Sequence, residues 1–294
     1  MELRQLRYFV ETAERLNFTE ASRALYITQS TLSQQIKQLE QELGVPLFDR
    51  VAKRVYLTEA GSEFLPYARR TLHDTENGTQ RLRDLQDVRT GELNIGVIYS
   101  LIAFLPRVVA AFSRSYPEVK INIAYHQTNN LYTMLRERRF DFALCYQSYE
   151  ADDTFEVERL FDTPLSVVMS RHHPLSARKR IPLSLLREFP LVLPTSTFYA
   201  RSVLDHLCQE QCVTLHPQVE MNGVSLLQEL VRDGHWVTVL SGATIADQPE
   251  LRAVPLAGNV QMQASIVSLR DTYQKNSVRE FWNILRRSLQ ERQE

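Results

Sequence analysis

The stretch ASRALYITQSTLSQQIKQLEQELGVPLFDRVAKRVYLTEAG, residues 21–61, contains the strongest fold signal in this chain. Its apolar residues recur at three- and four-residue spacing, which is typical of amphipathic helices. A short helix is predicted to pass through Ala24, and a longer one is predicted from about Gln29 to Leu43. Gly44 ends the longer helix because glycine accepts the left-handed conformation. Two short extended runs around a basic tip follow, and they predict a hairpin, or wing.

Two helices joined by a few residues are typical of a helix-turn-helix. Short Ser and long Gln side chains on the second helix suit base edges and phosphates, and cations at the wing suit the DNA backbone. The alternative is a solvated polar face on an ordinary helical bundle, but the wing that follows the second helix favours DNA. The residues expected to contact DNA are Thr28, Gln29, Ser30, Thr31, Ser33, Gln34, Lys37, Arg50, Lys53 and Arg54.

The flanking sequence divides the chain further. An apolar stripe from Leu3 to Leu16 predicts a helix before the helix-turn-helix, with Thr19 as the cap of the next one. A long helical stretch from Thr58 to about Arg89 has apolar positions along its length, so we expect it to pack against a partner, with a kink at Asn77-Gly78.

A domain boundary is predicted at Thr90-Gly91, after which strands and helices alternate. Strand 92–97, helix 101–116 and strand 120–125 begin this pattern, which is typical of βαβ units and a mostly parallel sheet. No Gly-rich phosphate loop, GxSxG motif or pair of carboxylates with an obvious base occurs, so we do not expect an enzyme.

Composition narrows the class of protein. The net charge is −1 and residues 1–90 are balanced in charge, so nucleic-acid binding would need a local patch. No apolar run approaches the roughly 20 residues that span a bilayer, and the polar N-terminus predicts no signal peptide, hence a cytoplasmic protein.

The cysteines favour neither disulfides nor a metal site. The chain has three, Cys145, Cys208 and Cys212, without zinc-like spacing, so we expect no disulfide framework, metal or cofactor. Cys208 and Cys212 lie four residues apart on one predicted helix face. A redox switch is conceivable there, but two packed or half-exposed thiols are favoured, and Cys145 is predicted to lie in the core.

With these residues in order, the chain resembles the LysR-type transcriptional regulators. One departure is at the start of the recognition helix, where the family usually has Ser-Gln-Pro-Ala and this chain has Thr28-Gln29-Ser30-Thr31. Thr and Ser still cap and start a helix, so the departure concerns base preference and not the fold. The residues that carry the resemblance are Phe9-Val10, Phe18-Thr19-Glu20-Ala21-Ser22, Ala24-Leu25, Gln29, Leu32-Ser33, Ile36, Leu39-Glu40, Leu43-Gly44, Leu47-Phe48-Arg50 and Leu57-Thr58-Ala60-Gly61.

The resemblance implies a multidomain α/β protein. A winged helix-turn-helix would occupy residues 1–58, and a linker helix that dimerises would occupy 59–90. A two-lobed α/β domain like a periplasmic binding protein would occupy 91–294, with lobe I at about 91–163 and 268–294 and lobe II at about 164–267. The implied partners are promoter DNA, a small-molecule effector, further copies in a homodimer or homotetramer, and RNA polymerase. The C-terminal sequence resembles most the subgroup of cyanate- and aromatic-acid-responsive regulators.

The resemblance also places the effector in the cleft between the lobes, among strand ends and helix N-termini that suit anions. Hydroxyls and one guanidinium there would hold a small carboxylate or similar oxyanion. The alternatives are helix capping for the hydroxyls and a surface ion pair for Arg201. The run from Gly234 to Ser241 departs from the family's Gly-x-Gly-x-x-x-Leu-Pro pattern, which bears on the pocket's shape. The expected effector contacts are Ser100, Leu101, Thr128, Thr195, Ser196, Thr197, Arg201 and Val224.

A second class of protein is a solute-binding protein, which would explain residues 92–294 alone. The helix-turn-helix and the absence of a predicted signal peptide disfavour it.

Overall fold

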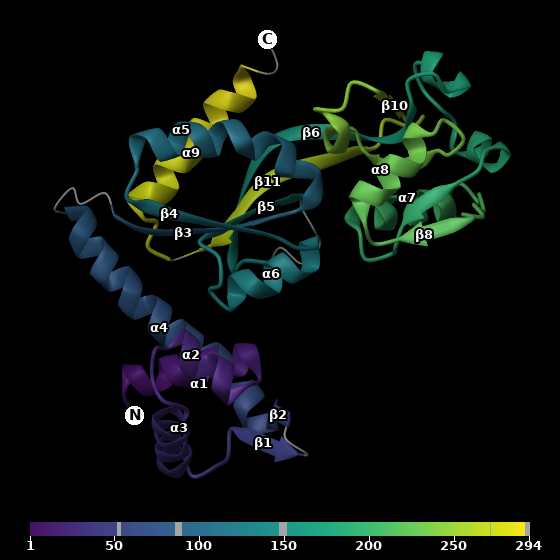
Figure 1. The fold of residues 1–294 in the computed structure, drawn as a ribbon. Coiled ribbons are helices and arrows are strands. Elements are labelled where there is room, and N and C mark those ends of the chain that lie inside the picture. Colours follow the sequence, from purple (N-terminus) through teal and green to yellow (C-terminus); the bar gives the residue numbers. More distant parts are fainter. Residues whose placement is uncertain (52–53, 86–89, 147–151, 271, 292–294) are drawn as a thin grey trace. The chain divides into compact units, whose positions relative to one another are not determined.

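The structure is a computed structural model that describes residues 1–51, 54–85, 90–146, 152–270 and 272–291. The chain divides into two units (Figure 1). Unit 1 comprises Met1–Val88 with Glu137–Arg139, and unit 2 comprises Arg89–Arg136 with Phe140–Glu294.

Unit 1 is a helical domain with a hairpin. Helices α1 (Leu3–Arg15), α2 (Phe18–Ala24) and α3 (Gln29–Leu43) precede strands β1 (Phe48–Val51) and β2 (Arg54–Leu57), and the long helix α4 (Glu59–Leu85) follows. The antiparallel hairpin pairs Phe48 with Leu57 and Val51 with Arg54, as the predicted wing requires.

The core of unit 1 forms where the apolar stripes of its helices meet. Phe9, Leu32 and Leu39 are fully buried, and the rings of Phe9 and Phe18 pack at 5.5 and 5.6 Å from that of Phe48. Each such side chain contributes roughly 1.5–3 kcal/mol through burial, so α3 is held by its apolar side and its other side is left for solvent.

Local hydrogen bonds set the helix ends of unit 1. The side chain of Asn17, and not of Thr19 as predicted, caps α2, because its oxygen accepts from the amides of Thr19 and Glu20. The Thr28 hydroxyl caps α3, and Gly44 ends α3 at φ 76°. Helix α4 continues through Asn77 and Gly78.

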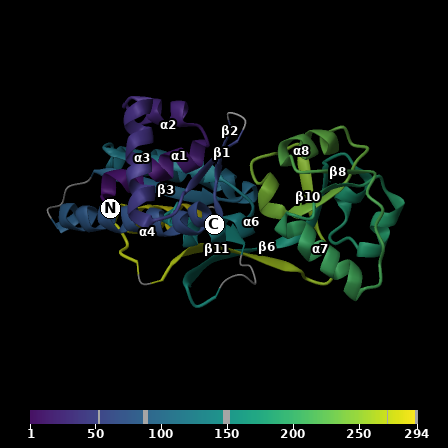
Figure 2. The ribbon, with the colours of Figure 1, turned by 90° about the horizontal axis from the view of Figure 1, so that it is seen from below.

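Unit 2 is built on a seven-stranded sheet ordered β10-β6-β11-β5-β3-β4, with β9 also paired to β6. Among the described strands of this sheet, the pairs β3–β4 and β3–β5 are parallel and the other pairs are antiparallel. The prediction of a mostly parallel sheet is therefore wrong. The long strands β6 and β11 run antiparallel to their neighbours and pass between the two lobes (Figure 2). The strands are β3 (Gly91–Val97), β4 (Val119–Tyr125), β5 (Phe142–Tyr146), β6 (Phe155–Ser170), β9 (Thr238–Ser241), β10 (Leu251–Pro255) and β11 (Gln261–Leu269).

Helices cover both faces of the first lobe's strands (Figure 1). Helices α5 (Leu105–Ser115) and α9 (Asn276–Gln290) lie on one face, and α6 (Thr128–Arg136) lies on the other. The second lobe carries α7 (Tyr199–Glu210), α8 (Val224–Arg232) and a small parallel sheet of β7 (Val192–Pro194) and β8 (Val219–Met221). Short 3-10 helices span Tyr99–Phe104, Pro174–Ala177, Leu183–Glu188 and Gly242–Ile245.

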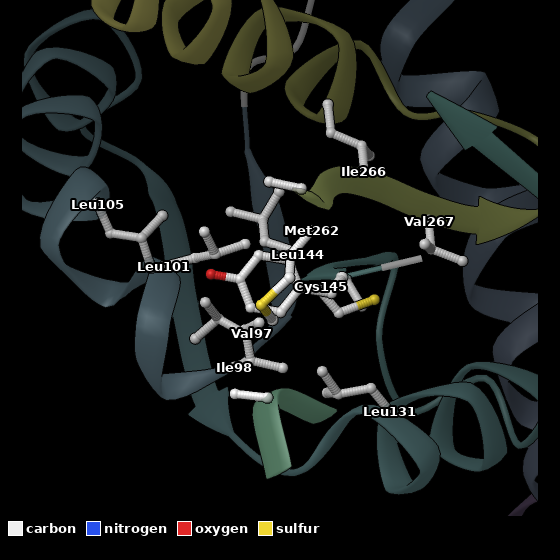
Figure 3. Close-up of a cluster of buried hydrophobic side chains, with 14 of the residues drawn as sticks. Val97, Ile98, Leu101, Leu105, Leu131, Leu144, Cys145, Met262, Ile266 and Val267 are labelled. Carbon is white, nitrogen blue, oxygen red and sulfur yellow. The ribbon is translucent and has the colours of Figure 1, made fainter. Parts of the chain in front are cut away.

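The largest core lies in unit 2, where β3, β5 and β11 meet their covering helices (Figure 3). Cys145 is fully buried within it, so the prediction that this cysteine lies in the core is confirmed. Burial raises the pKa of its thiol from 9.0 to about 12, because the thiolate would lose its hydration there. Among the described residues, no helix has the length and apolar character needed to cross a lipid bilayer.

Candidate functional site

Helix α3 presents a polar face opposite its buried side. Gln29, Ser30, Gln34 and Lys37 are exposed there, and Ser33 is partly buried. Gln29 Nε2 donates to Ser33 Oγ at 3.2 Å, so these two side chains orient each other. At the helix start, the Thr28 hydroxyl lies 2.9 Å from that of Ser30 and 2.8 Å from that of Thr31. Donors and acceptors held in this way can address base edges and phosphates.

The wing adds a cation beside this domain. Arg54 is exposed at the start of β2, opposite Val51 in the hairpin. Lys53 lies outside the described residues, as does the side chain of Arg50. The structure therefore describes Arg54 alone among the three expected wing contacts.

Unit 2 contains a cavity of about 370 Å³, which lies within the usual range for small-molecule sites. Segments from both lobes line it, at strand ends of the first lobe and helix starts of the second. Among the described lining residues, none is Asp, Glu, Lys or Arg. The lining residues are Ile98, Tyr99, Ser100, Tyr125, His126, Gln127, Thr128, Asn130, Tyr146, Thr197, Phe198, Tyr199, Ala200, Asn222, Gly223, Val224, Ser225 and Leu240.

Four of the eight expected effector contacts line the cavity: Ser100, Thr128, Thr197 and Val224. Leu101 does not, and it packs in the core (Figure 3). It lies on the 3-10 helix Tyr99–Phe104 and is 2% exposed, although its neighbours Tyr99 and Ser100 line the cavity.

Thr195 and Ser196 also lie outside the cavity lining. The amide of Thr195 donates to the Met221 carbonyl at 3.0 Å, and its hydroxyl lies 3.0 Å from that of Thr197. Thr195 therefore positions a lining residue. The side chain of Ser196 is exposed.

Arg201 lies elsewhere in the second lobe. Its guanidinium donates to Asp205 at 2.8 Å, to Glu220 at 2.6 Å and to the carbonyl of Pro194 at 3.0 Å. The structure thus places Arg201 in ion pairs, the alternative that the sequence left open. Two carboxylates neutralise the cation that we expected to hold the effector.

Aromatic and amide residues that the sequence did not single out complete the cavity. The Tyr99 hydroxyl lies 2.8 Å from that of Ser225, and Gln127 Nε2 donates to the Thr197 hydroxyl at 2.8 Å. Both bonds join the two lobes across the cavity. Each of these three residues is next in sequence to a residue that was expected to line the cavity: Tyr99 to Ser100, Gln127 to Thr128 and Ser225 to Val224. This adjacency is the sequence signal that could have identified them.

A buried hydroxyl network continues from the cavity wall. The Tyr146 hydroxyl donates to Ser241 Oγ, which also lies 3.3 Å from the Thr163 hydroxyl. Thr244 Oγ1 donates to Ser100 Oγ at 2.9 Å. Burial raises the pKa of Tyr146, so its phenol stays protonated and acts as a donor. At the position where the family pattern has Pro, Ser241 thus accepts a hydrogen bond from Tyr146 in the cavity wall.

Two helix N-termini lie at the cavity wall. Phe198 and Gly223 are the N-cap residues of α7 and α8, both line the cavity, and neither provides a side-chain hydrogen bond to its helix. The first amides of a helix have no partner within the helix, and its N-terminus carries a partial positive charge. Two helix N-termini at a cavity with no acidic residue among its described lining residues favour the binding of an anion.

The remaining two thiols, Cys208 and Cys212, lie in different surroundings. Cys208 is partly buried and Cys212 is exposed. Burial, and then the nearby Asp205, raise the pKa of the Cys208 thiol, which disfavours its reactive thiolate form. Within the described residues, no group of three or more His, Cys, Asp or Glu side chains could hold a metal ion.

A winged helix-turn-helix followed by a long helix and a two-lobed domain with a cavity defines a ligand-responsive transcriptional regulator. Residues 3–62 match the bacterial regulatory helix-turn-helix of the lysR family, and residues 86–290 match the LysR substrate binding domain. The chain therefore belongs to the LysR family of transcriptional regulators, and the fold class expected from the sequence is confirmed.

Individual relatives agree with this assignment. The chain is 28% identical to a probable RuBisCO transcriptional regulator of Thalassiosira pseudonana, over 96% of each chain. It is 30% identical to the RuBisCO operon transcriptional regulator of Allochromatium vinosum, over 86% of this chain and 83% of that one. A full-length OxyR variant from Pseudomonas aeruginosa shares the fold, with a TM-score of 0.74 at 24% identity over 99% and 95% of the two chains. The narrower resemblance to cyanate- and aromatic-acid-responsive regulators stays a prediction.

Proposed function

We propose that the cavity of unit 2 binds a small organic acid or small inorganic anion as the effector. The observation that carries this proposal is the meeting of the uncapped N-termini of α7 and α8 at a cavity with no acidic side chain among its described lining residues. Amides at helix starts bind anions without a cationic side chain, so the pairing of Arg201 elsewhere does not weaken the proposal. Ser100, Thr128 and Thr197 would supply hydroxyl hydrogen bonds.

The effector would act by shifting a population of lobe arrangements. The bonds Tyr99–Ser225 and Gln127–Thr197 join the two lobes at the cavity, so an anion that replaces or reinforces them would favour one arrangement. Strands β6 and β11 connect the lobes and would bend as the arrangement changes.

The polar face of α3 and the wing would bind promoter DNA. In this proposal α3 enters the major groove and the ten residues named above contact bases and phosphates. Helix α4 would pair with a second copy, giving a homodimer or homotetramer whose recognition helices lie about one DNA turn, roughly 34 Å, or multiples of it apart. A change in lobe arrangement would alter this spacing, the DNA bend and the contact with RNA polymerase.

The proposed domain limits are those given above: 1–58 for DNA binding, 59–90 for dimerisation and 91–294 for effector binding. Because the chain would act on chromosomal promoters, we place its function in the cytoplasm. It would act by binding alone, so a turnover screen against the effector panel described next should stay blank.

The decisive experiment is a footprint of the full chain on the DNA just upstream of its own gene. It is run with and without a panel of small organic acids and inorganic anions. The expected result is a protected interrupted palindrome that shortens or shifts with one anion. Protection that ignores every compound would contradict the effector proposal, and no protection at low salt, where phosphate contacts are strongest, would contradict DNA binding.

A further inference from the structure

Tyr26 lies in the turn between α2 and α3, two residues before the Thr28 cap, and its side chain is 96% exposed. Its neighbours Leu25 and Ile27 pack against the core of unit 1, which directs Tyr26 outward. Among the residues that the structure describes, nothing pairs with its hydroxyl. The fold of unit 1 therefore makes no use of this large aromatic side chain.

The backbone at Tyr26 is also unfavourable for a residue with a side chain. Its φ is 55°, in the left-handed region. The Tyr26 amide donates to the Arg23 carbonyl at 3.2 Å, and the Ile27 amide donates to the Ser22 carbonyl at 3.0 Å. This pair of bonds is the Schellman ending of a helix, and Tyr26 occupies the position where glycine is preferred. A bulky residue kept at a strained backbone position motivates a functional hypothesis.

The place of the strained residue indicates what it contacts. It borders the first turn of α3, whose exposed Gln29, Ser30 and Thr31 form the end of the helix that enters the groove in our proposal. With α3 in the major groove, a side chain beside that end would lie at the edge of the groove, where the sugar-phosphate backbone runs. Lys37 is the one basic residue on α3, and the exposed Arg23 on α2 is the basic residue nearest to Tyr26 in the sequence.

We propose that Tyr26 is a further DNA contact, with its phenol hydroxyl donating a hydrogen bond to a backbone phosphate oxygen beside the groove occupied by α3. The inference rests on the proposed DNA binding by α3. Tyrosine is among the side chains that make such contacts, which fix the register of the protein on the duplex and carry no sequence information. Its phenol is neutral, so the contact adds affinity without releasing a counterion.

The test measures DNA affinity and thermal stability for the full wild-type chain and three variants. The DNA is the fragment upstream of the chain's own gene, with an unrelated fragment beside it. Tyr26→Phe should weaken binding to both fragments by the same factor, about tenfold or more, as expected for one hydrogen bond to a charged group. Its salt dependence should match that of the wild type, because no charge is removed.

The other two variants separate the contact from the backbone strain. Tyr26→Gly should lose at least as much affinity as Tyr26→Phe and yet unfold at a higher temperature, because glycine relieves the strained position. Cys212→Gly is the matched control. Cys212 is exposed, has φ 53° and ends α7 with the same pair of bonds, from its own amide to Gln209 and from that of Val213 to Cys208. It should gain stability with DNA affinity unchanged.

Three outcomes would overturn the inference. If Tyr26→Phe binds DNA with wild-type affinity, the hydroxyl makes no contact with the phosphate, whatever the affinity of Tyr26→Gly. A loss confined to the upstream fragment indicates a base contact in place of a phosphate contact. A wild-type chain that binds neither fragment overturns DNA binding itself, which distinguishes the failure of the proposed function from the failure of this contact alone.

Discussion

The polar face of α3 and the cavity of unit 2 are assembled in opposite ways. The face comes from one helix, Thr28 to Lys37, and its side chains contact near neighbours in the sequence. The cavity comes from segments near residues 99, 127, 198 and 224, joined by bonds such as Tyr99–Ser225 that span more than a hundred positions. The face is open to solvent, so its affinity for DNA should depend on salt concentration. The affinity of the cavity for an anion should depend on the helix N-termini that line a partly enclosed space.

Because different segments form the polar face and the cavity, the two sites should fail separately. Damage to the packing of unit 1 should abolish DNA binding and leave anion binding in unit 2. Damage to the cavity should do the reverse, while the polar face stays in place. The following substitutions test this expectation.

Gly61→Ala should have the largest effect. A Cβ at Gly61 would lie 2.2 Å from the Leu47 carbonyl oxygen, and backbone cannot yield as a flexible side chain does. We expect a loss of about 3 kcal/mol from the stability of unit 1, at the upper end for overpacking, with DNA binding lost. Thermal unfolding and gel shifts measure both.

Gly78→Ala is the matched control for Gly61→Ala, on the same helix, with no atom within 4 Å of the added Cβ. It should stabilise the helix by about 0.5–1 kcal/mol, since glycine is costly inside helices. If both variants unfold alike and both keep DNA binding, the packing of Leu47 against α4 does not hold the winged domain.

Cys145 should weaken unit 2 at alkaline pH. Its pKa in the folded chain is raised from 9.0 to about 12, so the neutral thiol's contribution is fully present below pH 9 and is lost as the pH rises toward 12. Between pH 9 and 12 the free energy of unfolding should therefore fall by up to about 1.4 kcal/mol per pH unit because of this thiol. Denaturant unfolding from pH 8 to 11 measures it.

Cys145→Ala should flatten this alkaline decline at the cost of some stability at neutral pH, since it leaves a small void. Cys212→Ala, at an exposed thiol, should keep the decline of the wild type. Equal slopes in all three proteins would mean that Cys145 titrates alike in the folded and unfolded chains.

Thr128→Val should weaken binding of the anion identified by the footprint by about tenfold, because a buried lining hydroxyl becomes a methyl group. Arg201→Ala should leave that affinity within about twofold, since its guanidinium is paired with Asp205 and Glu220 outside the cavity. Titration calorimetry measures both affinities. A larger loss of anion affinity in Arg201→Ala than in Thr128→Val would mean that the guanidinium contacts the effector.

Lys37→Gln should have the smallest structural effect and a purely electrostatic one on DNA binding. Removing one phosphate contact should lower affinity uniformly across DNA sequences and reduce the slope of log affinity against log salt by about one. Gel shifts at several salt concentrations measure it. An unchanged slope would place Lys37 away from the phosphates.

The sequence by itself determined the part of the molecule whose causes are local. Helical periodicity placed Leu32, Ile36 and Leu39 on the buried side of α3, and the Thr28 cap and Gly44 end mark its limits as predicted. These features depend on residues within a few positions of one another, so a single stretch contains all the information. Four of the eight predicted effector contacts line the cavity for the same reason, because they lie at or near helix starts, which local sequence indicates.

Only the tertiary structure decided the rest. Leu101 is buried in the core although Tyr99 and Ser100 beside it line the cavity, and Arg201 is neutralised by Glu220, nineteen positions away on another element. Ser241 joined Tyr146 because β5 and β9 end at the same place, ninety-five positions apart in the chain. Pairings over such separations depend on how strands and helices pack, which the pattern of neighbouring residues does not encode.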